Sequence, residues 1–448
     1  MVLKWSDQGY QKDVYDLVKD FCSSEDAHAL SEGTKRPDVY IYGKWLLQTS
    51  SQIDEYTWRL GQFALMLGMW RDMISSRDDD EAKRLYDEVA SMKDDIDDER
   101  LLLIADLIEA RYLLMLKETD RAMAILSDRE VDVFGEAATQ QGEVYPTVYR
   151  LHEATGVGAD EFRSNVDVEA VYYFYKYRAL GYQLSNNFTL SYDGFLRAQD
   201  VSHLFLSSGV EKGDLNYSVG VTGMRNHDLV RCVECGEVAV ELFRRAQVWR
   251  RVADSYVLLG LVYKRLNRFL DAHRAFDWAR SSGEWLCDRD LLGRVFNNLG
   301  ELYEKMFNDD EAVRYYMKAF HFKRKQDRLV SVYSILSLLR RQEEFAKMRP
   351  WVDVGLQLYA ELGEHDVLYP YYLHIKSYDY LIAGDEEVFV DFVADVVIPY
   401  FEEKLDYYNV GVYARVIGLR FMEMGDAERG ARYLILSQES LDKVSHFR

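Results

Sequence analysis

Residue types that carry chemistry are sparse in this sequence. Cys232 and Cys235 form a Cys-x-x-Cys pair in the string RCVECGEVAVEL. A zinc site usually needs four ligands, and no second cysteine pair or histidine stands at ligand spacing from these two. We therefore interpret them as two small residues on a helix. The nine histidines are scattered and no Ser/His/Asp group has a useful spacing, so the sequence predicts no metal and no cofactor.

Two groups of charged residues stand out. Residues 78–99 hold eleven acids and three bases, a net charge of −8. Such a run is usually a solvated face; otherwise it contacts a basic partner such as a DNA-binding domain. The strings RRAQVWRR and KRLNRF bring together Arg244, Arg245, Arg250, Arg251, Lys264 and Arg268. These side chains would form a patch for an acidic ligand or a peptide carboxylate, or else pair with acids on an outer face.

Composition favours a helical, cytoplasmic chain. Five prolines in 448 residues leave little room for the turns of a β fold. The net charge of −21 repels a phosphate backbone, so direct nucleic-acid binding is not expected. No apolar run reaches the roughly 20 residues of a membrane span, and the first residues match neither a signal nor a transit peptide. We expect a cytoplasmic protein without membrane contact.

An internal repeat positions many of these residues. Gly260 in ADSYVLLGLVYKRLNRFLDAHRAFDWA aligns with Gly300 in GRVFNNLGELYEKMFNDDEAVRYYMKA, 40 residues later. The other aligned pairs are Leu259/Leu299, Tyr263/Tyr303, Ala272/Ala312, Phe276/Tyr316 and Ala279/Ala319. Small residues at these places let two antiparallel helices cross closely, with the aromatic rings filling the space beside them. The pattern resembles the tetratricopeptide repeat (TPR), whose usual period is about 34 residues, so we predict a lengthened turn within SSGEWLCDRD.

The repeat organises the chain into four predicted parts. We expect an all-α fold: an N-terminal helical extension (1–55), a three-helix bundle (56–130), a linker or hinge (131–166) and a TPR array (167–448). The array should coil as a right-handed superhelix with a concave inner face, the usual seat of an extended peptide. The extension lacks the basic recognition helix of a helix-turn-helix, and its role stays open.

The predicted domain order, a helical bundle followed by a linker and a TPR array, resembles that of the Rap proteins of Bacillus and relatives. The strings that carry this resemblance are ERLLLIADLIEARYLLML, VYYFYKYRALGY, SSGVEKGDL and NNLGELYEKM. The resemblance implies a cytosolic regulator that binds a phosphorylated response regulator and dephosphorylates it, or binds a response-regulator transcription factor and blocks its DNA contact. It also implies that a short imported peptide binds the concave TPR face and brings the bundle onto the repeats, which releases the target.

The resemblance places the catalytic position of the phosphatase members at Glu99, or at Arg100 if the alignment gap is moved by one residue. Those members carry a glutamine there, just before the third bundle helix, whereas this chain reads IDDERLLLIA. A carboxylate near an anionic phosphoryl group costs roughly 1 to 4 kcal/mol, which slows the reaction by about one to three orders of magnitude. Glu99 is therefore the candidate catalytic residue of a weakened phosphatase, or an acid favoured by the helix dipole.

The resemblance also locates a candidate peptide site. Family members commonly carry an asparagine that clamps the peptide backbone, and this chain has Leu261 at that position. Asn298 and Glu234, in the next and preceding repeats, are candidate polar contacts. Candidate basic contacts are Arg244, Arg251 and Lys264.

We predict a Rap-like regulator that binds a response regulator or a DNA-binding protein through its bundle and is switched by a short signalling peptide, as in quorum sensing. Three alternatives stay open: an aspartyl-phosphate phosphatase that uses Glu99, a TPR scaffold without a switching ligand, and a DNA-binding regulator. The sequence does not fix the oligomeric state.

Overall fold

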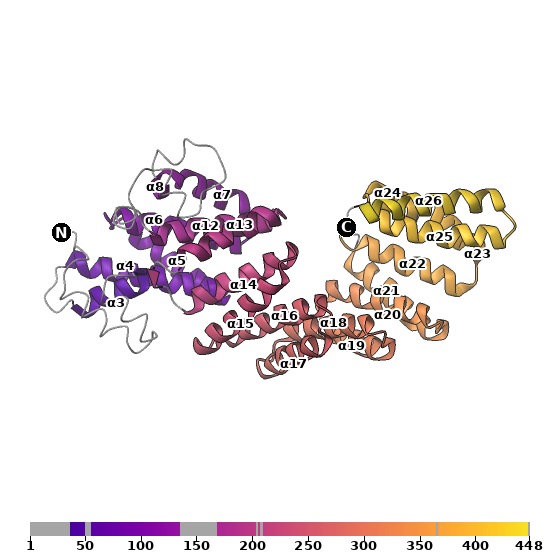
Figure 1. Ribbon diagram of the computed structural model, residues 1–448, viewed down its shortest axis with the longest axis horizontal. Coiled ribbons are helices and arrows are strands. Elements are labelled where there is room, and N and C mark those ends of the chain that lie inside the picture. Colours follow the sequence, from indigo (N-terminus) through magenta and orange to yellow (C-terminus); the bar gives the residue numbers. More distant parts are fainter. Residues whose placement is uncertain are drawn as a thin grey trace. The chain divides into compact units, whose positions relative to one another are not determined.

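The computed structural model describes residues 36–49, 55–134, 168–202, 205–206, 209–363 and 366–446. Helices make up nearly all of this part (Figure 1), and its strands are the two-residue β1 (Arg36–Pro37) and β2 (Phe205–Leu206), which pair in parallel. The predicted all-α fold is confirmed. Most of the predicted extension and nearly all of the predicted linker lie outside the described residues.

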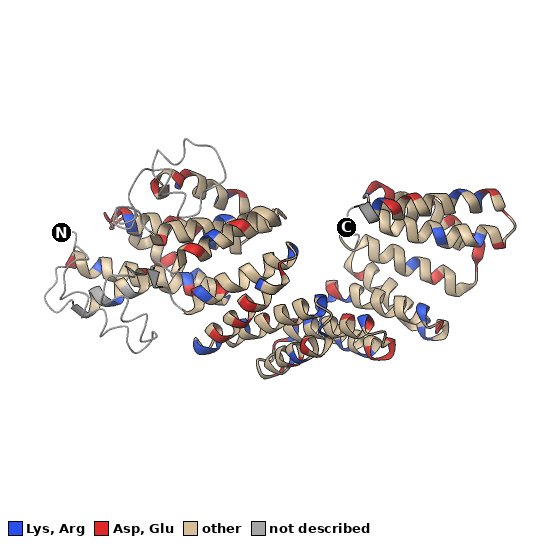
Figure 2. Ribbon diagram, viewed as in Figure 1, with Lys and Arg blue, Asp and Glu red and all other residues tan. Residues whose placement is uncertain are grey.

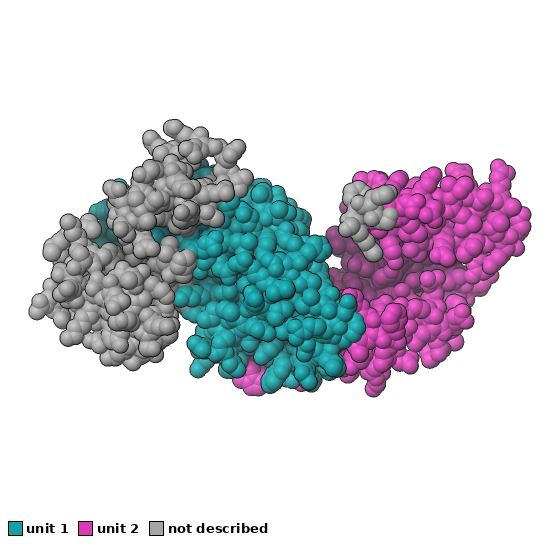
Figure 3. Space-filling view, viewed as in Figure 1, with its two compact units in different colours: residues 1–282 teal, residues 283–448 magenta. Residues whose placement is uncertain are grey.

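The chain divides into two compact units, residues 1–282 and 283–448 (Figure 3). Within the described ranges, no helix is long and apolar enough to cross a membrane. The predicted boundaries at 55, 130 and 166 do not coincide with the division between the units, and they remain predictions.

The described part of unit 1 starts with β1, which is followed by a group of short and medium helices. They are α3 (Val39–Thr49), α4 (Glu55–Ser76), α5 (Asp79–Lys93), α6 (Glu99–Met115), α7 (Thr119–Asp128) and α8 (Glu130–Phe134). Aspartates start two of these helices, because the side chains of Asp78 and Asp98 accept hydrogen bonds from the backbone N–H groups of Glu81 and Leu101.

Helices α3 and α4 pack closely because glycines stand at their crossing. A Cβ added to Gly43 would lie 2.4 Å from the backbone nitrogen of Leu65 and 2.7 Å from the carbonyl oxygen of Gly61. A Cβ on Gly68 would lie 2.4 Å from the Cβ of Tyr40. Any larger residue at Gly43 must push the two backbones apart.

The repeat helices of unit 1 follow. They are α12 (Val168–Leu184), α13 (Phe188–Ser202), α14 (Gly209–Arg225), α15 (Leu229–Arg245), α16 (Trp249–Arg265) and α17 (Phe269–Trp285), the last of which ends just beyond the boundary between the units.

The 40-residue period has a different cause from the one predicted. Each helix from α14 to α17 has 17 residues, and the turns between them are residues 226–228, 246–248 and 266–268. The predicted lengthened turn in SSGEWLCDRD is wrong, because α17 runs to Trp285 and only residues 286–288 of that string form a turn. Longer helices, rather than a longer loop, therefore extend the repeat beyond the usual TPR length.

The turns share one geometry. Their middle residues adopt the left-handed conformation, with φ between 57° and 63° at His227, Gln247 and Asn267. The N–H of the next residue then reaches back to a carbonyl five positions earlier, as from Val248 to Phe243 and from Arg268 to Tyr263, both at 2.9 Å. This Schellman-type closure satisfies the last carbonyl groups of each helix.

The helices of each repeat cross at the glycines found in the sequence. A Cβ on Gly260 would lie 2.4 Å from the ring of Phe276, and one on Gly300 would lie 2.7 Å from the ring of Tyr316. The ring of Tyr303 stacks on Tyr315 at 5.3 Å. The alanines of the pattern are fully buried: Ala272, Ala279, Ala312 and Ala319.

Unit 2 continues with helical hairpins. Its elements are α18 (Arg289–Lys305), α19 (Asp309–Phe322), the 3₁₀ turn η2 (Lys325–Asp327), α20 (Arg328–Arg341), α21 (Phe345–Leu362), α22 (Tyr369–Ala383), α23 (Glu386–Phe392), the π-helical η3 (Val393–Val397), α24 (Ile398–Glu403), α25 (Tyr407–Glu423) and α26 (Ala427–His446). The described residues between about 330 and 400 are helical, as the predicted all-α fold requires.

A buried histidine lies in the core of unit 2. His374 on α22 is 6% exposed, and its Nδ1 lies 2.6 Å from the hydroxyl of Tyr413. The rings of Tyr333 and Phe401 lie 4.6 and 5.4 Å from the imidazole. Burial lowers the pKa of His374 from 6.5 to about 4, although Asp406 acts weakly in the other direction.

This histidine predicts acid sensitivity of unit 2. Because its pKa is lower in the folded state, the neutral ring stabilises the fold above pH 6.5, and that contribution is lost as the pH falls toward 4. The full effect is about 3 kcal/mol. Urea unfolding of the His374→Leu variant should show a shallower loss of stability between pH 7 and pH 4 than the parent chain; equal slopes would contradict this role.

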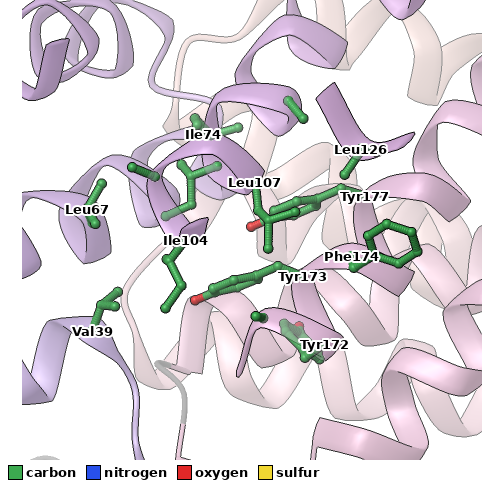
Figure 4. Packing of buried hydrophobic residues seen from close by; sticks show 14 of the residues in the cluster. Val39, Leu67, Ile74, Ile104, Leu107, Leu126, Tyr172, Tyr173, Phe174 and Tyr177 are labelled. Atoms are coloured by element: carbon green, nitrogen blue, oxygen red, sulfur yellow. The ribbon is translucent and has the colours of Figure 1, made fainter. Parts of the chain in front are cut away.

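The main core of unit 1 runs without interruption from the N-terminal helices into the repeats. Figure 4 shows Val39, Leu67 and Ile104 on α3, α4 and α6 together with Tyr173 and Tyr177 on α12, all almost fully buried. The N-terminal helices and the first repeat therefore form one packed body.

Candidate functional site

Charged side chains also penetrate this core, where α4, α12, α14 and α16 meet. Acidic and basic segments occur on the same helices in Figure 2. The buried charged residues of this region are Asp38, Arg71, Glu169, Lys176, Glu211, Asp214, Arg251 and Asp254. We call this set, with the tyrosines that bind it, the ionic junction.

One half of the junction is built around Arg71 on α4. Its Nη1 donates to Asp38 at 2.9 Å and to the hydroxyl of Tyr173 at 2.7 Å. The Tyr173 hydroxyl donates in turn to Glu169 at 2.9 Å, and Arg100 on α6 pairs with the same glutamate at 2.8 Å. These bonds connect the start of α3, α4, α6 and α12.

The other half is built around Lys176 on α12. Its ammonium lies 2.7 Å from Glu211 and 2.9 Å from Asp214, both on α14. Glu211 also accepts hydrogen bonds from Ser75 on α4 and Tyr172 on α12, each at 3.0 Å. Helix α14 is thereby held to both the N-terminal helices and the first repeat.

Arg251 extends the junction to α16. It is 1% exposed, pairs with Asp214, and lies over the rings of Tyr217 and Phe243 at 4.4 and 4.9 Å. Burial alone would disfavour ionised Asp214, but Lys176 and Arg251 outweigh it and hold the pKa of Asp214 below its usual value. At Asp72, by contrast, burial prevails over Arg71 and raises the pKa to about 6.

The junction can hold helices together but is poorly suited to act on a substrate, because its ions are buried and each faces an opposite charge. A buried ion pair is costly to separate once formed. The junction therefore fixes the position of the N-terminal helices relative to the first repeats of unit 1.

Glu99 lies elsewhere, at the first position of α6. Its side chain is exposed, directly after the capping residue Asp98. In the described part of the chain no cation lies within ion-pair distance of Glu99, while Asp94, Asp95 and Asp97 precede it in the same acidic loop. The helix N-terminus favours a carboxylate here; the catalytic role remains a prediction.

The candidate peptide residues are spread over three helices. Glu234 and Arg244 are exposed on α15, while Leu261 and Lys264 are half-buried on α16. Asn298 is half-buried on α18, in unit 2.

The predicted basic patch is largely matched by acids. Arg244 and Arg245 both pair with Glu241, and Arg268 pairs with Asp271. Arg251 lies inside the ionic junction rather than on a surface. The peptide-binding roles of all these residues remain predictions.

Cys232 and Cys235 are both buried on α15. Burial raises the pKa of the Cys232 thiol to about 12, so this thiol stays protonated and unreactive near neutral pH.

Sequence reasoning missed the acids and the lysine at the centre of the junction. A signal was present, because Lys176 stands in the apolar string VYYFYKYRALGY, and Glu211 and Asp214 stand in SSGVEKGDL. A lysine among so many apolar residues requires a buried partner. Both strings carried the family resemblance, yet were not interpreted as partners.

The fold and the ionic junction define an all-α TPR protein whose N-terminal helices are joined to its first repeats through a charged core. A model of the tetratricopeptide repeat matches residues 293–325, around Gly300. The chain has the fold of the Rap and NprR regulators, and the predicted resemblance to the Rap proteins is confirmed.

Particular relatives support this. Apo RapI has a TM-score of 0.64 and 14% identity, covering 86% of this chain and 99% of that chain. The apo quorum sensor NprR from B. thuringiensis has a TM-score of 0.65 and 14% identity, covering 84% of this chain and 97% of that chain. The transcriptional activator NprA of Geobacillus stearothermophilus is 24% identical over 395 residues, 86% of this chain and 89% of that protein.

Proposed function

We propose that this protein is a peptide-switched regulator of the cytoplasm that binds a signalling protein. The ionic junction carries the proposal, because it couples the N-terminal helices to α12, α14 and α16 through buried charges. A ligand that shifts these repeat helices changes the free energy of the state in which the junction is formed. A ligand can switch a protein only if it binds one of two conformational states more tightly than the other.

The proteins to which this chain is similar support the proposal that a ligand switches it. NprR is described as a quorum sensor, and a Rap protein with a TM-score of 0.55 to this chain was solved with the competence and sporulation factor bound. For this chain we place the peptide on the repeats of unit 1, near Leu261 and Lys264. Lys264 offers a cation to a peptide carboxylate.

The effector surface in this proposal is the acidic loop between α5 and α6. Asp94, Asp95, Asp97 and Glu99 are all exposed there. A partner with a basic surface, such as the DNA-binding domain of a response regulator, would be attracted and oriented by this loop.

Two other functions, a phosphatase and a DNA-binding regulator, would require different features of the chain. A phosphatase would need Glu99 to place water beside an aspartyl phosphate, and the acids around it oppose the phosphoryl charge. A DNA-binding regulator is favoured by the similarity to the transcriptional activator NprA, but the net charge of −21 opposes contact with DNA.

The proposal is tested by capture from native cytosol with the full-length chain. Deleting the N-terminal helices is unsuitable, because it would remove the buried contacts that Arg71 and Ser75 make with Tyr173 and Glu211 of the repeats. We instead use a variant with Asp94→Asn, Asp95→Asn, Asp97→Asn and Glu99→Gln. A matched control neutralises four exposed acids of unit 2: Glu402, Glu403, Glu423 and Glu428.

A response regulator or its DNA-binding domain should be captured by the parent and control chains and lost from the loop variant. Equal capture by all three would show that the loop is not the effector surface. The captured regulator then serves for a phosphate-release assay in which Glu99→Gln alone is compared with the parent chain; rapid release by the parent would favour the phosphatase instead.

A further inference from the structure

A hollow of about 260 Å³ opens on unit 1 between α15, α16 and α17. Its buried apolar lining is Val240, Leu259 and Ala275. Its remaining lining is aromatic or charged: Glu237, Tyr256, Tyr263, Asp271, Arg274 and Trp278. The function proposed above makes no use of it.

An aromatic platform forms one wall of this hollow. The rings of Tyr256 and Trp278 are nearly parallel, with an interplanar angle of 17° and centroids 6.1 Å apart. Trp278 is nevertheless 61% exposed. An indole held in a fixed orientation with an open face is a ready surface for a flat or cationic group.

Glu237 supplies a negative charge at the edge of the platform. It accepts a hydrogen bond from the Tyr263 hydroxyl at 3.1 Å, and across the described residues no cation lies within ion-pair distance of it. Its neighbour Glu241 is matched by Arg244 and Arg245. The Glu237 carboxylate is thus oriented by a neutral donor while its charge is left uncompensated.

The carboxylate on the opposite rim already has cations beside it. Asp271 pairs with Arg268 at 2.8 Å, and Arg274 stands 3.9 Å from the same carboxylate. A positively charged guest therefore has one place in the hollow where it meets an uncompensated charge, between Glu237 and the open indole face.

The hollow is distinct from the predicted peptide face of α16. At about 100° per residue, Leu261 and Lys264 lie roughly 120° around the helix from the face formed by Tyr256 and Tyr263. A ligand in the hollow and a peptide over Leu261 therefore need not compete.

We infer that this hollow is a docking site for an arginine side chain of a partner protein. The guanidinium stacks on the indole of Trp278 and pairs with the Glu237 carboxylate, while its methylene stem covers Leu259 and Ala275. Arginine suits the site better than lysine because its planar fork stacks and donates to a carboxylate at the same time.

The test uses the full-length chain labelled with 5-fluorotryptophan and observed by ¹⁹F NMR. The Trp278 resonance among the eight tryptophans is assigned from the Trp278→Phe variant. The probe is N-acetyl-arginine methylamide, and its uncharged analogue N-acetyl-citrulline methylamide is the matched control, both at constant ionic strength.

Addition of the arginine probe should move the Trp278 resonance saturably and leave the other resonances in place. The citrulline probe should bind about tenfold more weakly, since it lacks the cation. Glu237→Gln should weaken the arginine probe about threefold, the size expected for an exposed pair. Glu241→Gln, one turn along α15, should leave its binding unchanged.

Three results would overturn the inference. They are a Trp278 resonance that does not respond, a citrulline probe that binds as tightly as the arginine probe, and a Glu237→Gln variant that binds the arginine probe as tightly as the parent chain does. A Trp278 resonance that moves with protein concentration alone would assign the surface to a second copy of this chain instead. None of these readouts depends on the peptide switch, so the two proposals stand or fall separately.

Discussion

The Lys176→Met variant should lose about 3 to 5 kcal/mol of stability in unit 1. Lys176 is 2% exposed and is the cation that Glu211 shares with Asp214. Methionine fills the same space but removes the ammonium that lies 2.7 Å from the fully buried Glu211 carboxylate. Breaking one side of a buried pair costs far more than the pair contributes, because the remaining ion is desolvated and uncompensated.

Hydrogen exchange of the α12 and α14 amides in the native state measures this loss directly, since it reports the free energy of opening that part of the chain. Two further variants make the result specific. Adding Glu211→Gln to Lys176→Met should recover part of the loss, because an amide oxygen still accepts from Ser75 and Tyr172. Arg59→Met, which removes an exposed pair with Glu55 on α4, should cost less than about 1 kcal/mol. A loss that small for Lys176→Met would refute the junction.

Gly43→Ala should destabilise unit 1 by about 3 kcal/mol, the upper end of the range for overpacking. The added methyl would meet the backbone of α4 at 2.4 Å, which no side-chain rotation can relieve. Helix α3 must move, and Asp38, just before it, then leaves Arg71. This loss of stability exceeds the gain of roughly 1 kcal/mol that replacing glycine by alanine normally brings to a helix.

Thermal unfolding followed by circular dichroism measures this change. Gly209→Ala on α14 is the matched control, because a Cβ there has an ordinary contact of 3.8 Å with the carbonyl oxygen of Leu242. We expect that variant to match or exceed the parent chain in melting temperature. If Gly43→Ala did the same, the close crossing of α3 and α4 would be wrong.

Much of the fold was predictable because it depends on local periodicity. The glycines and alanines of the repeat predicted the helix crossings at Gly260 and Gly300, since close packing needs small residues at a fixed spacing. The cause of the 40-residue step was not predictable in the same way. A left-handed residue ends each helix at positions occupied by His227, Gln247 and Asn267, and none of these carries the glycine signal of a helix end.

The ionic junction was harder to find because its partners are distant in the sequence. Lys176 and Glu211 are 35 residues apart and Arg71 and Tyr173 are 102 apart, so no local pattern links them. The basic residues around Arg251 in RRAQVWRR predicted that its side chain belongs to a surface patch. The side chain instead lies in the core, where it is 1% exposed. Only the fold brings these charges together.

The most direct test of the account is capture of the effector protein by the full-length chain with and without the peptide-sized fraction of the same cytosol. Mass spectrometry identifies both the captured protein and any peptide retained. We predict that a response regulator or DNA-binding protein is captured without the fraction and released by it, with a short peptide bound to the chain. Partners that stay bound whether or not the fraction is present, with no peptide retained, would contradict the switch and leave a TPR scaffold as the better description.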